Sequence, residues 1–523
     1  MTSSQRATST TTNKHEEFFR FTRGRFLRDE KKELAQRYVK FDIDELARVA
    51  SRATGSTNHC ISIEKFADGM HNKAFLLTMD DGREIVAKIP NPNAGRKFFT
   101  TASEVATMDF MRNILKTPVP KVLAWSSQAD NPVQAEYILM EKAPGVQLNE
   151  IWHSLDIEGR LNVVKKIAKY QADWTAVSFS KFGGLYYKQD LISAPSLVYT
   201  DKEGKEVTDE RFAVGPSTSR QNTDDGRMEI EFDRGPWDSA AEYELATGLR
   251  ELACIKESTQ LPKSPIALYG PGTYRPCKEK KVQAIREYLR IVKYLLPDDK
   301  SIQKPHIWHD DLHLENIFVN PDDPSDILAF IDWQSTELAP LYDHTIEPYV
   351  LEYDGPPLEG LLERPKFEDV RKLFAEDPES ERKAKSLYLK MNLVALYRFL
   401  VHKTNKRLFQ ALEYRATDSF QLLLFARNLF VDGEATYLAL LFSDKEIATI
   451  EADSEGAALG INLMRDVQER LGSQFFQEQG LIEHEKIEEA KRELREIKQD
   501  LIREYASNEA EANEWEEAWP FDD

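Results

Sequence analysis

The chain carries the stretch HDDLHLEN at residues 309–316 and the tripeptide IDW at residues 331–333. Asp311 and Asn316 are five residues apart, and Asp332 follows after about one strand's length of chain. This order of oxygen-bearing side chains is typical of a phosphoryl-transfer site of the kinase type. One carboxylate orients the acceptor hydroxyl, while an amide oxygen and the second carboxylate hold the Mg²⁺ that bridges the ATP phosphates. We therefore expect Asp311 to be the catalytic base and Asn316 and Asp332 to be metal ligands.

The same stretch has an alternative interpretation as a zinc site. His309 and His313 are separated by helical spacing and His306 lies nearby, and two histidines so spaced on a helix can bind zinc. However, the stretch continues into Ile317-Phe318-Val319, which is typical of a strand. A loop followed by a strand favours phosphoryl transfer, and His309 then ties the turn to Asp332. Ordinary loop acids would not explain the order of the three polar residues between short apolar strands.

A lysine and a glutamate upstream complete the expected set. Lys88 lies in IVAKI at residues 85–89, at the end of a predicted strand, where a point charge can reach the α and β phosphates of ATP. Glu104 follows on the next predicted helix and can pair with Lys88. Each residue alone is more often a solvated surface residue. Their order is informative only because the acidic stretch follows downstream.

Two further segments lie where nucleotide contacts are expected. Gly69 lies between the first two predicted strands, where a glycine permits a tight turn near phosphate, although a plain hairpin turn is the alternative. Glu141 and Lys142 directly precede the breaker APG at residues 143–145. The backbone at such a junction between lobes can hydrogen-bond adenine.

Periodicity predicts two units of different character. Short alternating or apolar runs predict strands at 60–66, 73–79, 84–89, 122–125 and 136–141, with one helix over 101–115. Helical patterns then cover 157–177, 278–296, 384–402 and 417–430. We therefore expect an α+β fold of two lobes, with a small β-rich N-lobe and a large, mainly helical C-lobe.

We divide the chain accordingly. The expected parts are a disordered leader (1–15), a helical extension (16–57), the N-lobe (58–142), the C-lobe (143–479), a C-terminal helix (480–506) and an acidic tail (507–523). Residues 196–238 are polar and are expected to be an insertion with little core of its own. The tail has seven acidic residues and no Lys or Arg, which predicts a mobile segment unless its aromatic residues dock it.

Composition limits the function classes. The net charge of −20 argues against non-specific binding of nucleic acid, and no apolar run approaches the roughly 18 residues of a transmembrane helix. The three cysteines are widely spaced and form no disulfide or metal framework, which fits a reducing compartment. The leader is rich in Ser and Thr and has no acidic residue, a composition compatible with a mitochondrial transit peptide and with a disordered tail.

Taken together, these residues resemble the aminoglycoside phosphotransferase and choline kinase branch of the protein-kinase-like fold. That branch carries an H-x-D-x-x-x-x-N loop, matched by His309, Asp311 and Asn316, and a metal-binding Asp followed by Trp, matched by Asp332-Trp333. The match runs from about Cys60 to at least Tyr342. The stretches FLLTMDDG (75–82), TTASEVATM (100–108) and ILMEKAPG (138–145) are similar to the fungal altered inheritance of mitochondria protein 9 group.

The resemblance implies an ATP- and Mg²⁺-dependent enzyme that moves the γ-phosphoryl group to a hydroxyl of a small molecule or, as a second choice, of a protein. It implies a mitochondrial location, with the cytoplasm as the alternative. Under it Lys88 binds phosphate and Glu104 orients Lys88. Relatives usually carry two glycines in the phosphate loop, whereas Met70 follows Gly69 here. A pseudokinase or scaffold that binds nucleotide or partners without turnover therefore stays open, as does transfer of AMP.

Overall fold

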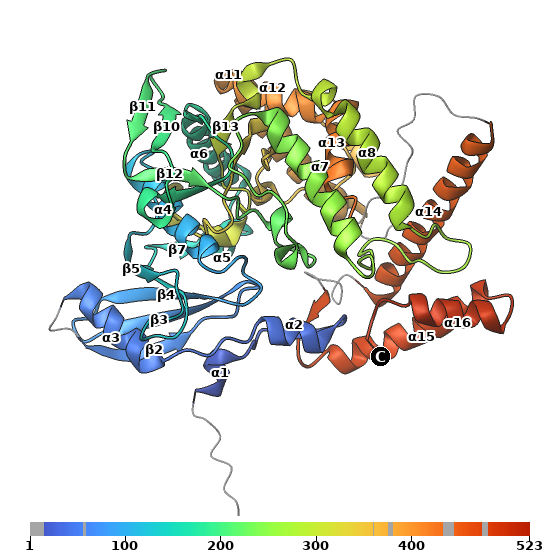
Figure 1. The fold of residues 1–523 in the computed structure, drawn as a ribbon, viewed down its shortest axis with the longest axis horizontal. Helices are drawn as coiled ribbons and strands as arrows, with labels where there is room; N and C mark the ends of the chain where they lie inside the picture. Colours follow the sequence, from blue (N-terminus) through green and yellow to red (C-terminus); the bar gives the residue numbers. More distant parts are fainter. Residues whose placement is uncertain are drawn as a thin grey trace, which may run out of the picture.

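The computed structural model describes residues 15–55, 59–358, 360–374, 380–431, 444–472 and 480–522. These residues form a small β-rich lobe and a larger, mainly helical lobe, with further helices from the C-terminal part of the chain beside them (Figure 1). The bilobal α+β fold expected from the sequence is confirmed. The predicted leader lies outside the described residues, except for its last residue.

The small lobe is built on an antiparallel five-stranded sheet in the order β2-β3-β4-β6-β5. Its strands are β2 Cys60–Lys65, β3 Asn72–Met79, β4 Glu84–Pro90, β5 Val122–Ser126 and β6 Tyr137–Glu141. Ala87 and Ile89 are buried in the cluster that also contains residues of the helix α3 Ile43–Thr54. Because successive side chains of a strand point to opposite faces, Lys88 between them points to the other face of the sheet.

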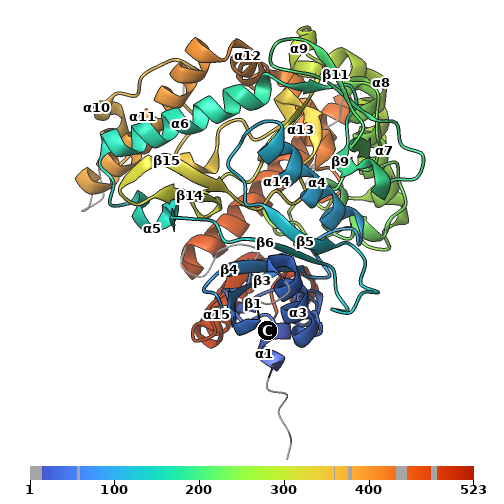
Figure 2. The same cartoon turned by 90° about the vertical axis from the view of Figure 1, so that its left-hand side faces the viewer.

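The helix α4 Phe99–Asn113 lies on that other face, between the sheet and the large lobe (Figure 2). No side chain of its own caps its first turn. Instead, Glu136, just before β6, accepts hydrogen bonds from the Phe98 backbone N–H (2.9 Å) and from the Thr101 hydroxyl (2.6 Å). The sheet therefore fixes the start of α4, and with it the position of Glu104.

The chain segment that joins the lobes packs against a hairpin of the large lobe. The segment continues into the short strand β7 Val146–Gln147, which pairs with β14 Ile317–Asn320. β14 in turn forms an antiparallel hairpin with β15 Asp323–Phe330. Gly145 has a φ of +81°, and a Cβ atom there would lie 2.2 Å from the carbonyl oxygen of Val319. Only glycine fits so close to the hairpin.

Most of the large lobe packs around one large hydrophobic cluster. Its main helices are α6 Ile157–Thr175, α7 Ala240–Glu257, α8 Lys278–Leu295, α11 Ser380–Thr404, α12 Lys406–Arg415 and α13 Asp418–Arg427, with the shorter α5 Leu148–Trp152, α9 Lys300–Gln303 and α10 Phe367–Lys372. The strand β13 Pro305–Ile307, which leads into the acidic stretch, pairs with β16 Leu338–Pro340. Trp174 packs edge-on against Trp308 and Trp333, which flank the predicted catalytic residues in sequence. A rigid aromatic core thus supports the site.

The predicted insertion over residues 196–238 differs from expectation. It forms β10 Leu197–Thr200, β11 Glu206–Asp209 and β12 Phe212–Gly215, which pair with each other or with the preceding strands β8 Ser178–Phe179 and β9 Gly184–Tyr187. Leu197 and Phe212 are buried in the main core. The expectation of little core was wrong, because a few alternating apolar residues suffice to attach a polar segment to an existing core.

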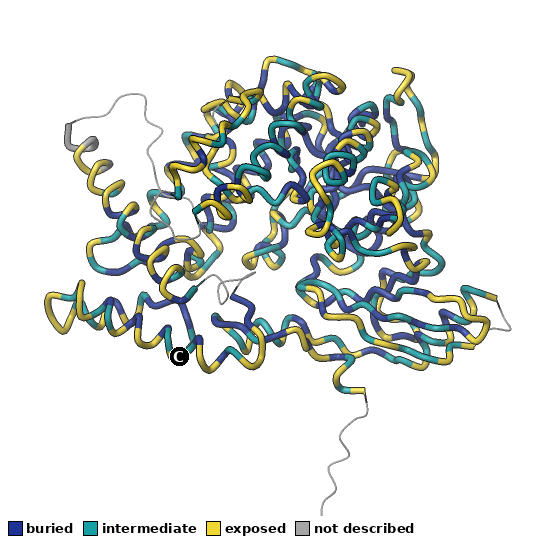
Figure 3. The backbone as a smooth tube through the Cα atoms, turned by 180° about the vertical axis from the view of Figure 1, so that it is seen from behind, coloured by how far each residue is buried: buried dark blue, intermediate teal, exposed yellow. Residues whose placement is uncertain are grey.

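The predicted acidic tail also differs from expectation. Residues 509–518 form the helix α16 Glu509–Ala518, and Trp515, Trp519 and Phe521 are buried in a separate cluster with α14 Asp444–Leu471 and α15 Ile487–Tyr505. Most of the acidic residues of α16 are exposed (Figure 3). Its aromatic residues therefore dock the tail. Among the described residues, no helix is long and apolar enough to cross a membrane.

The close approach at Gly145 yields a stability prediction. Gly145→Ala should lower the free energy of unfolding by about 3 kcal/mol, because the new methyl group collides with the Val319 carbonyl and the residue must also keep a positive φ. Gly82→Ala is the matched control, since Gly82 has the same φ of +81° and open space around it. Gly82→Ala should lower the free energy of unfolding by only about 1 kcal/mol. Urea unfolding of both variants measures the difference, and equal losses would contradict the assigned contact.

Candidate active site

Lys88 forms ion pairs with residues of both lobes. Its ammonium Nζ lies 2.7 Å from Oε1 of Glu104 on α4 and 2.6 Å from Oδ1 of Asp332, which follows β15 in the large lobe. Lys88 and Glu104 are buried, and the Asp332 side chain is 38% exposed. Residues separated by 244 positions in the sequence are thus joined by one ammonium group. The structure brings together three of the residues that the sequence predicted.

The charges at this junction shift one another's pKa. Burial alone would lower the pKa of Lys88, but the carboxylates of Asp332 and Glu104 outweigh burial and raise it. Burial would raise the pKa of Asp332, but the Lys88 ammonium outweighs it and holds that pKa below its ordinary value. Burial keeps the pKa of Glu104 raised despite Lys88. Two carboxylates share one ammonium, and the side chain of Asp332 is the more exposed of the two.

The backbone at Asp332 is held in a left-handed conformation, with a φ of +60°. Such a conformation costs an ordinary residue about 1 kcal/mol, and Asp tolerates it better than most. The carbonyl and N–H of Ile331 are both engaged: the carbonyl accepts from Nε2 of His309 at 2.8 Å, and the N–H donates to the carbonyl of Asn316 at 3.0 Å. His309 therefore ties the turn to Asp332, as predicted.

Asn316 connects the remaining predicted residues. It ends a short 3₁₀ helix, Leu314–Asn316, and its side-chain Nδ2 donates to the carbonyl of Asp311 at 2.9 Å and lies 3.0 Å from Nε2 of His313. Its Oδ1 has no hydrogen bond to any residue that the structure describes. The Asp311 side chain is 65% exposed, and His313 lies 3.6 Å from its Oδ2. The carboxylate of Asp311 is therefore open to an acceptor while its backbone is fixed.

Sequence reasoning missed a second ion pair that holds the loop. Asp310 accepts from the Thr345 backbone N–H at 2.7 Å and lies 2.9 Å from Nδ1 of His344. The other ring nitrogen of His344 lies 3.0 Å from the carbonyl of His306. With an acceptor at each nitrogen, His344 fits as an imidazolium. The doubled Asp310-Asp311 was the one available signal, but nothing in the sequence indicated a partner 34 residues away.

The histidines of the acidic stretch have separate partners. His309 bonds to the Ile331 carbonyl, whereas His313 contacts Asn316 and Asp311. Within the described residues, no group of three or more His, Cys, Asp or Glu side chains is arranged to hold a metal ion. The hydrogen bond of His309 is the one expected if this histidine has a structural role in a phosphoryl-transfer site.

Gly69 lies in the loop that joins β2 and β3. It is exposed, and its N–H donates to the carbonyl of Asn72 at 3.2 Å. The next residues reach the large lobe, since Nδ2 of Asn72 donates to Oε1 of Gln334 at 2.5 Å and Gln334 donates to the carbonyl of Ala94 at 3.1 Å. The loop therefore lies over the segment that carries Asp332, where a phosphate-covering loop is expected.

Glu141 and Lys142 use their side chains on the surface of the small lobe. Lys142 Nζ lies 2.7 Å from Glu84, and the Glu141 carboxylate accepts from the Lys121 backbone N–H at 3.2 Å. Both side chains are partly exposed. If this junction contributes to adenine binding, it does so through backbone groups, as the sequence interpretation held.

The donor set at the junction fits Mg²⁺. This ion prefers oxygen ligands, and Asn316 offers a side-chain oxygen without a hydrogen bond among the described residues, while Asp332 offers a carboxylate with a lowered pKa. Two protein ligands are fewer than the six that Mg²⁺ takes. Phosphate oxygens and water normally supply the others at sites of this kind.

A family model and several known proteins match this chain. A family model described as "Phosphotransferase enzyme family" matches residues 62–346, more than half of the chain. A subtelomeric hrmA-associated cluster protein of Aspergillus fumigatus is 32% identical over 57% of this chain and 62% of its own length. The altered inheritance of mitochondria protein 9, mitochondrial, of Yarrowia lipolytica is 28% identical over 62% of this chain and 59% of its own length. The chain thus spans less than two thirds of these relatives.

Two solved structures are also similar in part. The GDP and kanamycin complex of APH(2″)-IIia aligns with 80% of this chain and 97% of that chain, at 13% identity and a TM-score of 0.34. The streptomycin–ATP–APH(2″)-IIa ternary complex aligns with 75% of this chain and 99% of that chain, at 11% identity and a TM-score of 0.33.

The Asp310–His344 pair yields a prediction of pH dependence. The charge of Asp310 outweighs burial and raises the pKa of His344 above its ordinary 6.5. A raised folded-state pKa means that the stabilisation is complete below pH 6.5 and is lost as the pH rises through the folded-state pKa. His344→Gln should therefore lower the free energy of unfolding by about 1–2 kcal/mol at pH 6, and by less at pH 9. This figure allows for solvent around the half-exposed Asp310.

Urea unfolding of the wild type and His344→Gln between pH 5.5 and 9 measures this difference. His59→Gln, at an exposed histidine, is the control and should show no such trend. A cost of His344→Gln that grows with pH would contradict the assignment of an imidazolium.

Proposed function

The chain belongs to the phosphotransferase enzyme family, and from this premise we propose that it transfers the γ-phosphoryl group of ATP, with Mg²⁺, to a hydroxyl of a small molecule. The observation that supports this most is the contact of Lys88 with both Glu104 and Asp332, beside a loop that holds Asp311 and Asn316. Phosphoryl transfer requires mainly positioning and charge neutralisation, and this arrangement offers both.

Asp311 is the proposed catalytic base. It orients the acceptor hydroxyl and accepts its proton as the hydroxyl oxygen bonds to the γ-phosphorus. The bond between that phosphorus and the oxygen bridging to the β phosphate breaks, so that a phosphate ester and ADP are the products. The exposed side chain and the fixed backbone of Asp311 suit a group that must meet a diffusing acceptor.

Lys88 is the proposed phosphate-binding residue. Its ammonium is buried, so that it interacts with phosphate charge more strongly than a surface lysine would. Glu104 holds the side chain of Lys88 in place from a helix whose start is fixed by the sheet. Asp332 lies beside the same ammonium, so that a metal ion held by Asp332 would be close to the phosphate bound by Lys88.

Asn316 and Asp332 are the proposed metal ligands. Mg²⁺ bound there neutralises charge on the phosphates during transfer. The hydrogen bond between the Asn316 carbonyl and the Ile331 N–H keeps the two ligand residues adjacent at the open end of the β14–β15 hairpin. The loop at Gly69 covers the phosphates in this proposal, and the backbone of Glu141 and Lys142 contacts adenine.

We also propose a mitochondrial location. Its support is that several relatives, including those of Yarrowia lipolytica and Clavispora lusitaniae, carry names that describe them as mitochondrial.

Two substitutions separate nucleotide binding from turnover. Asp332→Asn should abolish the Mg²⁺-dependent part of the stabilisation by ATP, because it removes a charged ligand. Asp311→Asn should keep that stabilisation while lowering turnover by about 10²- to 10⁴-fold, the usual contribution of a general base. Thermal-shift titration with ATP, with and without Mg²⁺, measures binding, and release of ADP with a panel of hydroxylated metabolites measures turnover.

Asp322→Asn is the matched control, since this exposed carboxylate lies at the other end of the same hairpin. A ligand at 100 times its dissociation constant should stabilise the protein by about 2.7 kcal/mol. A wild-type protein that shows no shift up to millimolar ATP would contradict the proposal and favour a scaffold. Near-normal turnover of Asp311→Asn would refute the role of Asp311 alone.

A further inference from the structure

The β2–β3 loop, residues 66–71, is held by segments from both ends of the chain. Met70 is partly buried and packs against a cluster of Phe21, Phe26 and Leu481. Phe21 and Phe26 belong to the N-terminal extension, and Leu481 lies more than 400 positions after Met70 in the sequence. The residue that departs from the glycine-rich pattern is therefore an anchor of the loop.

Asp68 anchors the same loop by hydrogen bonds. Its buried carboxylate accepts from the backbone N–H and the hydroxyl of Thr22, both at 2.8 Å, and lies 2.6 Å from Nζ of Lys65 and 3.1 Å from Nζ of Lys73. Both lysines also donate to the carbonyl of Arg20. A buried carboxylate with this many charge-assisted partners fixes its backbone.

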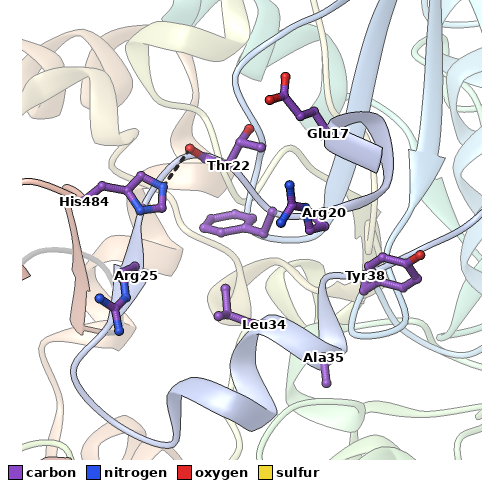
Figure 4. A pocket seen from close by; sticks show the side chains of 10 residues that line it. Glu17, Arg20, Thr22, Arg25, Leu34, Ala35, Tyr38 and His484 are labelled. Atoms are coloured by element: carbon purple, nitrogen blue, oxygen red, sulfur yellow. Dashed lines mark hydrogen bonds between the residues drawn. The ribbon is translucent and has the colours of Figure 1, made fainter. Parts of the chain in front are cut away.

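The C-terminal part of the chain holds the N-terminal extension in place. The strand β1 Arg25–Phe26 pairs antiparallel with β17 Leu481–Ile482. A hollow of about 600 Å³ lies beside this junction, and across it the ring of His484 bonds to the Thr22 carbonyl at 3.2 Å (Figure 4). A Cβ at Gly24 would lie 2.4 Å from the carbonyl of Ile482, so the two segments are in close contact.

The end of the chain reaches the first turn of the helix α2 Glu30–Gln36. The carboxylate of Asp522 accepts from the backbone N–H groups of Asp29 (3.1 Å) and Glu30 (2.9 Å). At the other end of α2, the carbonyl of Gln36 accepts from the Asn93 N–H at 3.3 Å. Nδ2 of Asn93 donates to the carbonyl of Met70 at 3.2 Å. Continuous contacts therefore run from Asp522 to the phosphate-covering loop.

We propose that these terminal segments act as a latch that positions the phosphate-covering loop, with Met70 and Asp522 as positioning residues for nucleotide binding. The proposal rests on the function proposed above. A free glycine-rich loop must be ordered when nucleotide binds, which weakens binding. Here the packing of Met70 and the bonds to Asp68 order the loop beforehand. ATP affinity then depends on residues that touch neither ATP nor metal.

Two variants of the full chain, each with a matched control, test the latch. Met70→Ala removes the packing at the loop, and Asp522→Ala removes the distant contact at α2. Met391→Ala is the control for the first, since Met391 is also partly buried but belongs to a separate cluster of the large lobe. Asp500→Ala is the control for the second, since it removes an ion pair with Arg470 on the C-terminal helices without touching α2.

Hydrogen exchange without nucleotide measures the loop directly. Amides of residues 68–72 should exchange at least about fivefold faster in Met70→Ala and Asp522→Ala than in the wild type and both controls. The dissociation constant for ATP with Mg²⁺ should rise about 3- to 10-fold in the same two variants. Met70→Leu, which refills the cluster, should restore both values.

The outcomes separate this proposal from the proposed function. Unchanged exchange of the loop in Met70→Ala and Asp522→Ala would overturn the latch even if the wild type bound ATP. Faster exchange with unchanged ATP affinity would overturn its role in nucleotide binding. A wild type that binds no ATP would refute the proposed function, and with it the role of Met70 in nucleotide binding, while the exchange data would still show whether the latch holds the loop.

Discussion

The ammonium of Lys88, between a carboxylate of the small lobe and one of the large lobe, is the constraint around which the rest of the structure is arranged. Burying a charge is expensive unless partners compensate it, so β4, α4 and the segment after β15 must meet at one point. Such a buried pair adds little net stability compared with apolar packing. Its effect is specificity, because another arrangement of the two lobes would take Asp332 away from Lys88 and leave the ammonium with Glu104 alone.

The large lobe meets this constraint mainly through backbone hydrogen bonds. Ile331, next to Asp332, is held on both sides by His309 and Asn316, and Asn316 also holds Asp311. Asp310 and His344 then attach the loop to the strand that precedes it. The exposed carboxylate of Asp311 thus stands on a loop whose backbone is held by hydrogen bonds, which leaves its side chain available for chemistry.

Patterns within short stretches of sequence predicted those parts of the structure that depend on neighbouring residues. Alternation along β3 and β4, a breaker at Gly145 and the five-residue spacing of Asp311 and Asn316 all follow from short windows of sequence. Lys88 and Glu104 were expected only because they precede that acidic stretch. His344 could not be found in this way, because its partner is far along the chain and a lone histidine carries no signal. For the tail, sequence left open whether it is mobile or docked, since composition averages over a segment while a few aromatic residues decide whether it docks.

The β2–β3 loop shows how such long-range contacts change the interpretation of a local motif. Read alone, Met70 after Gly69 is a defect, because a side chain replaces the freedom that a second glycine provides. In the fold, that side chain packs on Phe21 and Phe26, and Asp68 is bonded to Thr22. A loop that is anchored needs less backbone freedom than one that must fold over its ligand. Departure from a glycine-rich pattern is therefore weak support for lost activity when the departing residue has a partner in an added segment of the chain.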